Sequence, residues 1–386
     1  MTWLHNESYF SEEKVREQAR KYGFSDPIQV EFFLWDCEIA AQLQRESEDF
    51  VLKGGAAVQL HLPVEMQRGS VDVDIVAPKK KEEIVEVLSQ IHKRIPSVEF
   101  EKYTPKRPHK EINMVTYLAK VQPLIPSKNG RLREVKIDFL LEDVKLPIQM
   151  ISNKETFALT INQLKCYSVS SLIGDKILTL AENTIGISDL PDVPKQIYDV
   201  SVLSKKQQLT LSDFSEIFDA IETIVPLEAK YREQELTVLQ VLDDIEKTMD
   251  KYALSDTAEA DAGIKRNIVN FQQFYVSSSQ KWPLYVWSAR VLKIRFLCRL
   301  LKPVFDGKVD LKEAFNQYST AELIDQTLST IKGDKVKTVN KTLRDLADTQ
   351  IPCFRELKGK PLNRVFWQVV SSNNLSKINE LVKESV

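Results

Sequence analysis

Residues 70–75 of the chain, SVDVDI, alternate between polar and apolar side chains. A period of two is typical of a strand with one buried face, because successive side chains on a strand point to opposite sides of the sheet. The apolar set is expected to face a core. The Ser70 hydroxyl and the carboxylates of Asp72 and Asp74 are then expected to share the other face.

A short apolar run, residues 50–52, lies upstream of this strand and is followed by Lys53, Gly54 and Gly55. Two glycines allow the backbone to turn sharply and to approach a ligand without an intervening Cβ. Residues 56–62 predict a short helix, whose N-terminal amides suit a phosphate group. The segment 50–75 is therefore expected to form a strand, a glycine turn, a short helix and a second strand.

A hairpin and several helices are predicted for the rest of the first half. In residues 133–141, REVKIDFLL, Lys136 and Asp138 alternate with apolar side chains and are expected on one face of a strand. Residues 111–121 predict its hairpin partner. Apolar positions at helical spacing predict helices over 11–22, from 27 to the first strand, over 82–94, over 169–183 and from 194 onward.

Beyond residue 203 the pattern predicts helices alone, over 212–231, 236–252, 258–275, 282–301, 311–331, 339–347, 363–370 and 375–382. The mixture of strands and helices before that point predicts an α+β fold. We therefore expect one domain over 1–205, which includes the N-terminal helices, and a C-terminal all-helical domain over 206–386.

Composition bounds the class of protein. The chain has 386 residues, of which 43% are apolar and 28% charged, and these shares are ordinary for a soluble globular protein. A net charge of −2 gives no global reason to expect nucleic acid, so any such contact must come from local patches.

The cysteines and the N-terminus predict a cytoplasmic protein. The four cysteines are far apart and show no C-x-x-C spacing, which fits buried thiols in a reducing compartment better than disulfides or a zinc site. The N-terminus has no basic region followed by an apolar run, so we expect no signal peptide. No apolar stretch approaches the roughly 20 residues of a membrane span, and we expect no membrane contact.

The negative charges of Asp72 and Asp74 repel each other unless a positive charge lies between or beside them. A divalent cation is the usual answer, and Mg²⁺ prefers one or two carboxylates plus substrate phosphate oxygens. A glycine turn for phosphates beside an acidic strand face therefore indicates nucleotide chemistry. An ordinary edge strand with solvated aspartates is the alternative.

Lys176 lies four residues from both Leu172 and Leu180 and so projects from the apolar side of the helix predicted over 169–183. Burying an unpaired ammonium is strongly disfavoured, so Lys176 is expected to meet a phosphate or a carboxylate. The alternative is a lysine that extends to solvent from the edge of the apolar stripe.

A glycine pair followed by D-x-D on the next strand resembles the nucleotidyltransferase superfamily. KGGAA over 53–57 followed by RGSVDVDI over 68–75 resembles more closely the AbiEii/AbiGii toxins, the toxin halves of bacterial toxin–antitoxin and abortive-infection pairs. The resemblance implies a nucleotidyltransferase-fold mixed sheet flanked by helices.

The resemblance also implies roles for residues outside the D-x-D strand. The superfamily places a third carboxylate on an adjacent strand, and Asp138 fits. Lys176 and Asp199 match the family's third and fourth motifs, the latter in KQIYDV over 195–200. Gln196 stands where the family commonly has Asp, and Lys195 where it commonly has Arg, which puts a local salt bridge in doubt.

On this resemblance the protein is expected to transfer a nucleoside monophosphate from an NTP to an acceptor hydroxyl. Mg²⁺ would be held by Asp72, Asp74 and Asp138, although Asp138 could instead accept the hydroxyl's proton. The triphosphate would be bound by a further set, Lys53, Gly54, Gly55, Ser70 and Lys176. Asp199 would orient Lys176 or contact the nucleotide.

Relatives in the family modify the acceptor end of tRNA and stop growth, so the resemblance implies tRNA and a cognate antitoxin as partners. Two other functions stay open. One is a non-catalytic interaction protein with a nucleotidyltransferase fold, and the other is transfer to a protein hydroxyl or to a small molecule such as an antibiotic. Basic loops around residues 102–110 and 128–133 could bind RNA phosphates or merely aid solubility.

Overall fold

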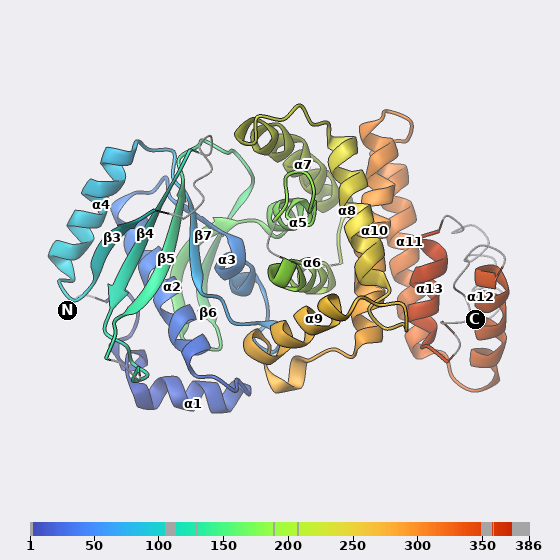
Figure 1. The fold of residues 1–386 in the computed structure, drawn as a ribbon, viewed down its shortest axis with the longest axis horizontal. Coiled ribbons are helices and arrows are strands. Elements are labelled where there is room, and N and C mark those ends of the chain that lie inside the picture. Colours follow the sequence, from blue (N-terminus) through green and yellow to red (C-terminus); the bar gives the residue numbers. More distant parts are fainter. Residues whose placement is uncertain are drawn as a thin grey trace.

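The computed structural model describes residues 3–104, 113–127, 130–187, 190–206, 208–348, 357 and 359–372. A sheet with its helices forms one side of the molecule, and helices alone form the other (Figure 1). The buried apolar side chains make one continuous cluster through both sides. The predicted α+β fold, with a mixed sheet followed by helices, is confirmed.

The sheet has seven strands in the order β3-β4-β5-β2-β1-β7-β6. Its two parallel pairs are β2 with β5 and β1 with β7, and the remaining neighbours are antiparallel. The strands are β1 Val51–Lys53, β2 Asp72–Val76, β3 Glu99–Tyr103, β4 Met114–Val121, β5 Arg133–Leu140, β6 Ile148–Glu155 and β7 Thr160–Tyr167. The strands around 50 and 70–75 and the hairpin of β4 with β5 are confirmed, whereas β3, β6 and β7 were not predicted.

The strand register brings the acidic side chains together. Asp74 lies opposite Lys53 of β1 on one side and Asp138 of β5 on the other, and Asp72 lies opposite Lys136. The strand β1 ends at Lys53, so Asp72 extends beyond its antiparallel neighbour.

Helices surround the sheet in the first half. They are α1 Glu12–Tyr22, α2 Ile28–Glu46, α3 Gly54–His61, α4 Lys81–Arg94, α5 Val169–Leu178 and α6 Val193–Lys206. The Ser11 side chain caps α1 by accepting a bond from the Lys14 amide, as a serine before a helix does. Helix α3 begins two residues before the predicted position, at Gly54 itself.

Helix α5 ends at Leu178, five residues before the predicted end. The backbone amide and side-chain amide of Asn183 both donate to Asp244, and the Thr184 hydroxyl donates to the same carboxylate. These bonds to a distant helix hold residues 179–187 in a loop and override the helical pattern of the sequence.

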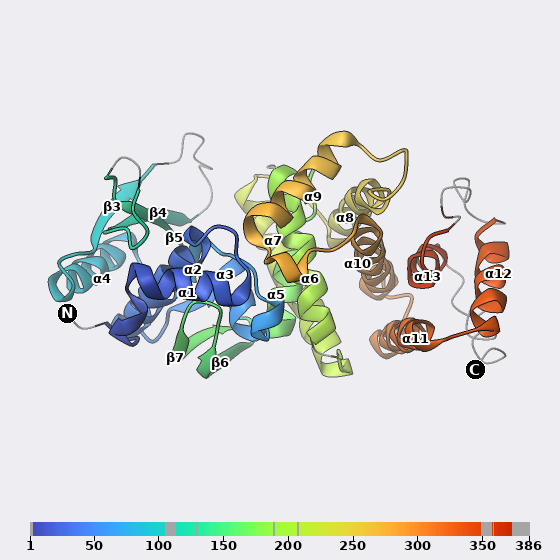
Figure 2. The same cartoon turned by 90° about the horizontal axis from the view of Figure 1, so that it is seen from below.

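The second half consists of helices (Figure 2). They are α7 Leu211–Tyr231, α8 Val238–Ala253, α9 Ala262–Tyr275, α10 Leu284–Phe305, α11 Leu311–Thr330, α12 Asp334–Asp348 and α13 Leu362–Val370. Helix α7 crosses α5 closely: a Cβ on Gly174 would lie 2.7 Å from the Cβ of Ala220. The helix predicted over 375–382 lies outside the described residues.

Among the described helices, none combines the length and the apolar composition that crossing a bilayer requires. The thiols of Cys37, Cys166 and Cys298 are buried and make no disulfide, as the spacing predicted. Cys353 lies outside the described residues.

Candidate active site

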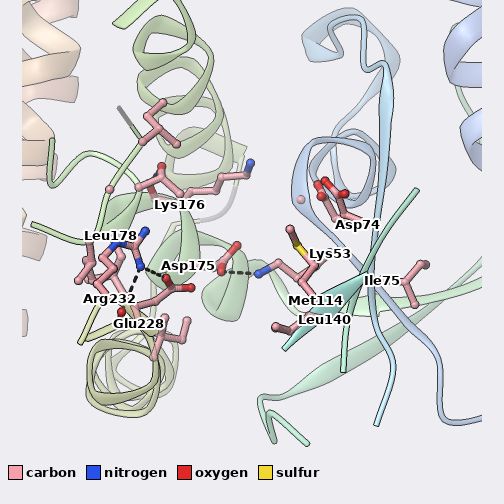
Figure 3. Close-up of a pocket in the computed structure, with 17 residues that line it drawn as sticks. Lys53, Asp74, Ile75, Met114, Leu140, Asp175, Lys176, Leu178, Glu228 and Arg232 are labelled. Atoms are coloured by element: carbon pink, nitrogen blue, oxygen red, sulfur yellow. Dashed lines mark hydrogen bonds and ion pairs between the residues drawn. The ribbon is translucent and has the colours of Figure 1, made fainter. Parts of the chain in front are cut away.

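A cavity of about 360 Å³ lies between the sheet and the helices α5 and α7 (Figure 3). The sheet side of its lining consists of Lys53, Gly54, Asp74, Ile75, Met114, Asp138 and Leu140. The helical side consists of Asp175, Lys176, Leu178, Thr179, Ile185, Gly186, Ile187, Ile224, Glu228 and Arg232. The cavity is therefore charged beside the D-x-D strand and more apolar beside the loop 179–187.

Gly54 stands where β1 turns into α3 and touches the D-x-D strand. Its φ is +69°, and a Cβ there would lie 1.8 Å from Asp74 Oδ2. A left-handed φ and a missing Cβ are both properties of glycine. A Cβ on the next residue, Gly55, would lie 3.1 Å from the Ser70 Oγ. The glycine pair thus lets the first turn of α3 approach Asp74 and Ser70 directly.

The carboxylates of Asp72, Asp74 and Asp138 lie on adjacent strands and repel one another. Burial raises the pKa of Asp74 to about 6, and the charges of Asp138 and Asp72 add to this effect. The pKa of Asp72 is also raised, first by burial. No ion pair within 4 Å reaches Asp72 or Asp74 from the described residues.

The Asp138 carboxylate has two partners within the protein. Its Oδ1 accepts a bond from the Thr116 hydroxyl at 2.6 Å, and its Oδ2 contacts the Lys136 ammonium at 2.6 Å. Lys136 shares the face of Asp138, as the alternation of the strand predicted, and it was not assigned a role from the sequence.

The residues of this site fit a divalent cation that is bound by two carboxylates. No group of three or more His, Cys, Asp or Glu side chains in the described parts of the chain is arranged to hold a metal ion. Asp72 and Asp74 nevertheless offer hard oxygen atoms without a neutralising partner. They suit Mg²⁺, which takes one or two carboxylates and completes its shell with phosphate oxygens.

Asp36, in the middle of α2, is a further carboxyl group near the D-x-D strand, and the sequence pattern assigned it no role. It is fully buried. Burial raises its pKa well above the usual value, the charges of Asp72 and Asp74 raise it further, and the nearby Ser70 hydroxyl opposes the rise. A carboxylate between Trp35 and Cys37 in the largely apolar run FFLWDCEIAA was the signal that could have revealed it.

The two lysines of the cavity have different partners. The ammonium of Lys53 lies 2.9 Å from Asp175 Oδ1 (Figure 3), and burial, which alone would lower the pKa of Lys53, is outweighed by the nearby charge of Asp175. Lys176 extends toward Asp74 across the cavity in the same figure. Burial lowers the pKa of Lys176, and Asp199, 3.8 Å away, opposes that shift.

Asp199 is held by an arginine that was not assigned a role from the sequence. Arg68 donates from Nε and Nη2 to the two carboxylate oxygens of Asp199 at 2.8 and 2.6 Å. Both side chains are buried, and neither lines the cavity. The geometry therefore favours Asp199 as a group that orients Arg68 and Lys176 over one that contacts a nucleotide.

The structure brings Lys53, Gly54, Asp74, Asp138 and Lys176 to one cavity. The other candidates surround it: Gly55 and Ser70 behind the glycine turn, Asp72 at the outer end of β2, and Asp199 behind Lys176.

The other basic residues and motif positions singled out in the sequence lie outside the cavity or outside the described residues. Lys195 makes an ion pair with Asp192 at 3.0 Å, and the buried Gln196 Oε1 has no partner among the described residues. Arg133 pairs with Glu31 at 2.9 Å and is used within the fold. Much of the basic loops, residues 105–112 and 128–129, lies outside the described residues.

Comparisons with known proteins identify a family for the chain. The family described as nucleotidyl transferase AbiEii toxin, type IV toxin–antitoxin system, matches residues 39–283. Among curated protein sequences, none matches the chain.

Two solved structures are similar to the chain at low identity. MenT4, a nucleotidyltransferase toxin from Mycobacterium tuberculosis H37Rv, is 13% identical with a TM-score of 0.48, over 80% of this chain and 99% of that one. An antigenic nucleotidyltransferase-like protein from Paracoccidioides brasiliensis is 14% identical with a TM-score of 0.34, over 54% of this chain and 95% of that one.

Proposed function

Because the chain belongs to the family of AbiEii nucleotidyl transferase toxins of type IV toxin–antitoxin systems, we propose that it transfers a nucleoside monophosphate from an NTP to a hydroxyl of tRNA. The protein is a nucleotidyltransferase, and its family implies an NTP substrate and a cognate antitoxin. One observation carries the proposal: two carboxylates and two lysines from four distant segments line a single cavity.

Asp72 and Asp74 would hold a Mg²⁺ ion, which would neutralise charge on the triphosphate. In phosphoryl transfer a protein forms few covalent bonds itself, so it acts mainly by positioning the reactants and compensating charge. Gly54, Gly55 and Ser70 would bind phosphate oxygens through the first amides of α3 and a hydroxyl. Lys53 and Lys176 would face the triphosphate from opposite walls of the cavity.

The reaction would exchange one bond to the α-phosphorus for another. The oxygen of the acceptor hydroxyl forms a bond to the α-phosphorus, and the bond from that phosphorus to the bridging oxygen breaks. The electron pair leaves with pyrophosphate, and the hydroxyl proton passes to the Asp138 carboxylate or to water. Asp138 fits the base role because Thr116 and Lys136 already fix the orientation of its carboxylate.

Asp199 would act through its neighbours. Its carboxylate is fully buried and holds the Arg68 guanidinium, while the Lys176 ammonium lies 3.8 Å away. The same charge limits the loss of protonation that burial imposes on Lys176. A charged Lys176 would then stabilise negative charge that develops on the phosphates.

At the level of the cell we propose a growth-arresting toxin in the cytoplasm, controlled by its antitoxin. The division into a catalytic domain over 1–205 and a helical domain over 206–386 remains part of the proposal. Residues of α7 line the same cavity as β2, so both parts would contribute to NTP binding.

The proposal is tested by incubating the protein with each α-labelled NTP, Mg²⁺ and total tRNA. We expect label on tRNA from one NTP or a subset. Asp72→Ala and Lys176→Ala should each lower the rate by about 100-fold or more, because each removes charge compensation for the phosphates.

Asp143→Ala and Lys145→Ala are matched controls, since this exposed pair lies 3.3 Å apart at the surface. Equal labelling by wild type and the two site variants would reject these residues as catalytic. Label on a protein or a small molecule with none on tRNA would replace the acceptor and retain the transferase activity.

A further inference from the structure

The two carboxylates of the D-x-D strand face different surroundings. Asp74 lies opposite Lys53 and lines the cavity, whereas Asp72 lies beyond the end of β1 and does not line it. In the strand register Asp72 lies opposite Lys136 of β5. Lys53 and Lys176 line the cavity together with Asp74. The site therefore has an inner side and an outer side.

The outer side is formed by Asp72, Lys136 and Lys195, which we call the acceptor rim. The Lys136 side chain is 40% exposed although it pairs with Asp138. Lys195 lies in the first turn of α6 and pairs with Asp192, three residues before it, at 3.0 Å. Its ammonium lies 5.3 Å from the centre of the Tyr275 ring.

Lys195 is fixed near the start of the D-x-D strand by a second contact. The backbone carbonyl of Tyr275 accepts a hydrogen bond from the Gly69 amide at 2.8 Å. Gly69 precedes Ser70 and Asp72 in the same segment, so the ring beneath Lys195 is tied to that segment. Two lysines from different elements, β5 and α6, thus lie on the outer side of Asp72.

We propose that the acceptor rim binds the backbone phosphates of a nucleic-acid acceptor and directs its hydroxyl to the site past Asp72, while the NTP occupies the inner cavity. This inference rests on the proposed transferase function and adds the side from which the acceptor enters. Two separated ammonium groups, of which Lys136 is 40% and Lys195 16% exposed, suit a chain of phosphates better than an uncharged protein hydroxyl.

The charges of the rim also predict a requirement for the divalent cation. Asp72 and the ion-pair partners of the two lysines, Asp138 and Asp192, outnumber those lysines, so the metal-free rim repels an anionic acceptor. A cation held by Asp72 and Asp74 would reduce that repulsion. RNA binding is therefore expected to be stronger with Mg²⁺ than with a chelator, even without NTP.

The test measures binding of a short single-stranded RNA, labelled with fluorescein at its 5′ end and with a free 3′ hydroxyl, by fluorescence anisotropy. Mg²⁺ is present and NTP is absent, so no turnover occurs. Lys195→Ala and Lys136→Ala should each weaken binding by about threefold to tenfold and reduce the salt slope by about one. Lys195→Arg should retain most of the affinity.

Two control variants match the local structure of the two lysines. Lys14→Ala removes a lysine with the same i,i+3 pairing, to Glu17, in α1. Lys120→Ala removes a strand lysine that pairs with Glu101 in the sheet. Both should bind the RNA like wild type. Equilibrium binding of NTP should be unchanged in Lys195→Ala, which separates a role in the rim from a loss of folding.

The outcomes separate the two proposals. Unchanged RNA affinity and salt slope in Lys195→Ala would overturn the acceptor rim, even if nucleotide transfer is observed. Transfer to a protein or a small molecule, with no RNA binding by wild type, would also overturn it. A wild-type protein that binds NTP and RNA but transfers nothing would contradict the proposed function and leave the rim supported.

Discussion

At Asp74, burial and two like charges oppose ionisation, and no cation among the described residues lies within ion-pair distance. The carboxyl group has an ordinary pKa of 3.8 and a pKa of about 6 in the fold. A raised pKa means that the folded state binds the proton more tightly than the unfolded state. The contribution of Asp74 to stability is therefore present at acidic pH and lost as the pH rises from 3.8 through about 6.

We predict that Asp74→Asn stabilises the metal-free protein at neutral pH, because asparagine resembles the protonated acid and carries no charge. The gain should be about 1–2 kcal/mol, less than the full shift implies because the half-buried side chain retains some contact with water. Thermal unfolding of both proteins with a chelator, from pH 4 to pH 8, measures the difference.

The two melting curves should converge near pH 4 and separate toward neutral pH. Mg²⁺ should then raise the Tm of wild type more than that of Asp74→Asn. A difference that grows toward acid instead would contradict the raised pKa of Asp74.

The residues of the site could be predicted only where a local sequence pattern indicated them. The alternation SVDVDI placed Asp72 and Asp74 on one face. The glycine pair indicated a turn, and the absence of a Cβ at Gly54 leaves room there for the Asp74 carboxylate. Asp36 carried only the weaker signal of an acid within an apolar helical run, and Arg68 lies in a loop without periodic pattern. Their roles arise from partners far along the chain.

At the scale of elements, the ion pair of Arg68 and Asp199 joins the loop before β2 to helix α6. Both groups are buried, and two short bonds connect them. Removal of one partner leaves the other as an uncompensated buried charge, which is strongly destabilising.

We predict that Asp199→Leu alone destabilises the fold by about 3–5 kcal/mol, as does Arg68→Met alone. The double variant Arg68→Met with Asp199→Leu should recover much of that loss, because two apolar side chains can replace a buried pair. Urea unfolding of the four proteins gives the coupling free energy. Additive losses in the double variant would mean that the two charges are stabilised independently.

The double variant also reports on Lys176. A stable protein that has lost Asp199 but binds NTP like wild type would exclude a positioning role for that carboxylate. We expect instead a weaker NTP affinity, because Lys176 would lose the charge that opposes the effect of burial on its pKa.

Elements with a clean period could be predicted, whereas strand β7, which has buried residues on both faces, could not. In β7 the buried Leu164 and Cys166 alternate with exposed or half-buried residues, yet Ile161 and Tyr167 are buried on the other face. The period of two is therefore broken in the sequence. Helix α5 shows the opposite case, since its pattern continues after the bonds to Asp244 have ended the helix.

At the scale of the whole molecule, helix α5 connects the cavity to the helical half. Gly174 faces Ala220 of α7, and a Cβ there would also lie 3.3 Å from the Ile217 carbonyl oxygen. Lys176 is two residues further along the same helix. The position of this lysine thus depends on a close crossing of two helices that no local pattern could predict.

We predict that Gly174→Ala separates α5 from α7 and lowers the free energy of unfolding by about 1–3 kcal/mol. NTP affinity should fall as well, because Lys176 and the α7 residues of the cavity move apart. The double variant Gly174→Ala with Ala220→Gly should restore the contact distance and regain NTP affinity.

Thermal unfolding and NTP titration of the three variants and wild type measure both effects. Ala220→Gly alone controls for the loss of helix propensity, which is about 1 kcal/mol. Loss of stability without loss of NTP affinity in Gly174→Ala would mean that the crossing supports the fold and does not position Lys176.

The cavity has one wall from the sheet and one from α5, the 179–187 loop and α7. An inhibitor designed for this protein would face two unlike chemical demands. A polyphosphate mimic would satisfy the carboxylate-and-lysine end alone and would resemble the ligands of many other enzymes. A second group that reaches Ile187 and Arg232 on the opposite wall would add an apolar contact and a guanidinium contact.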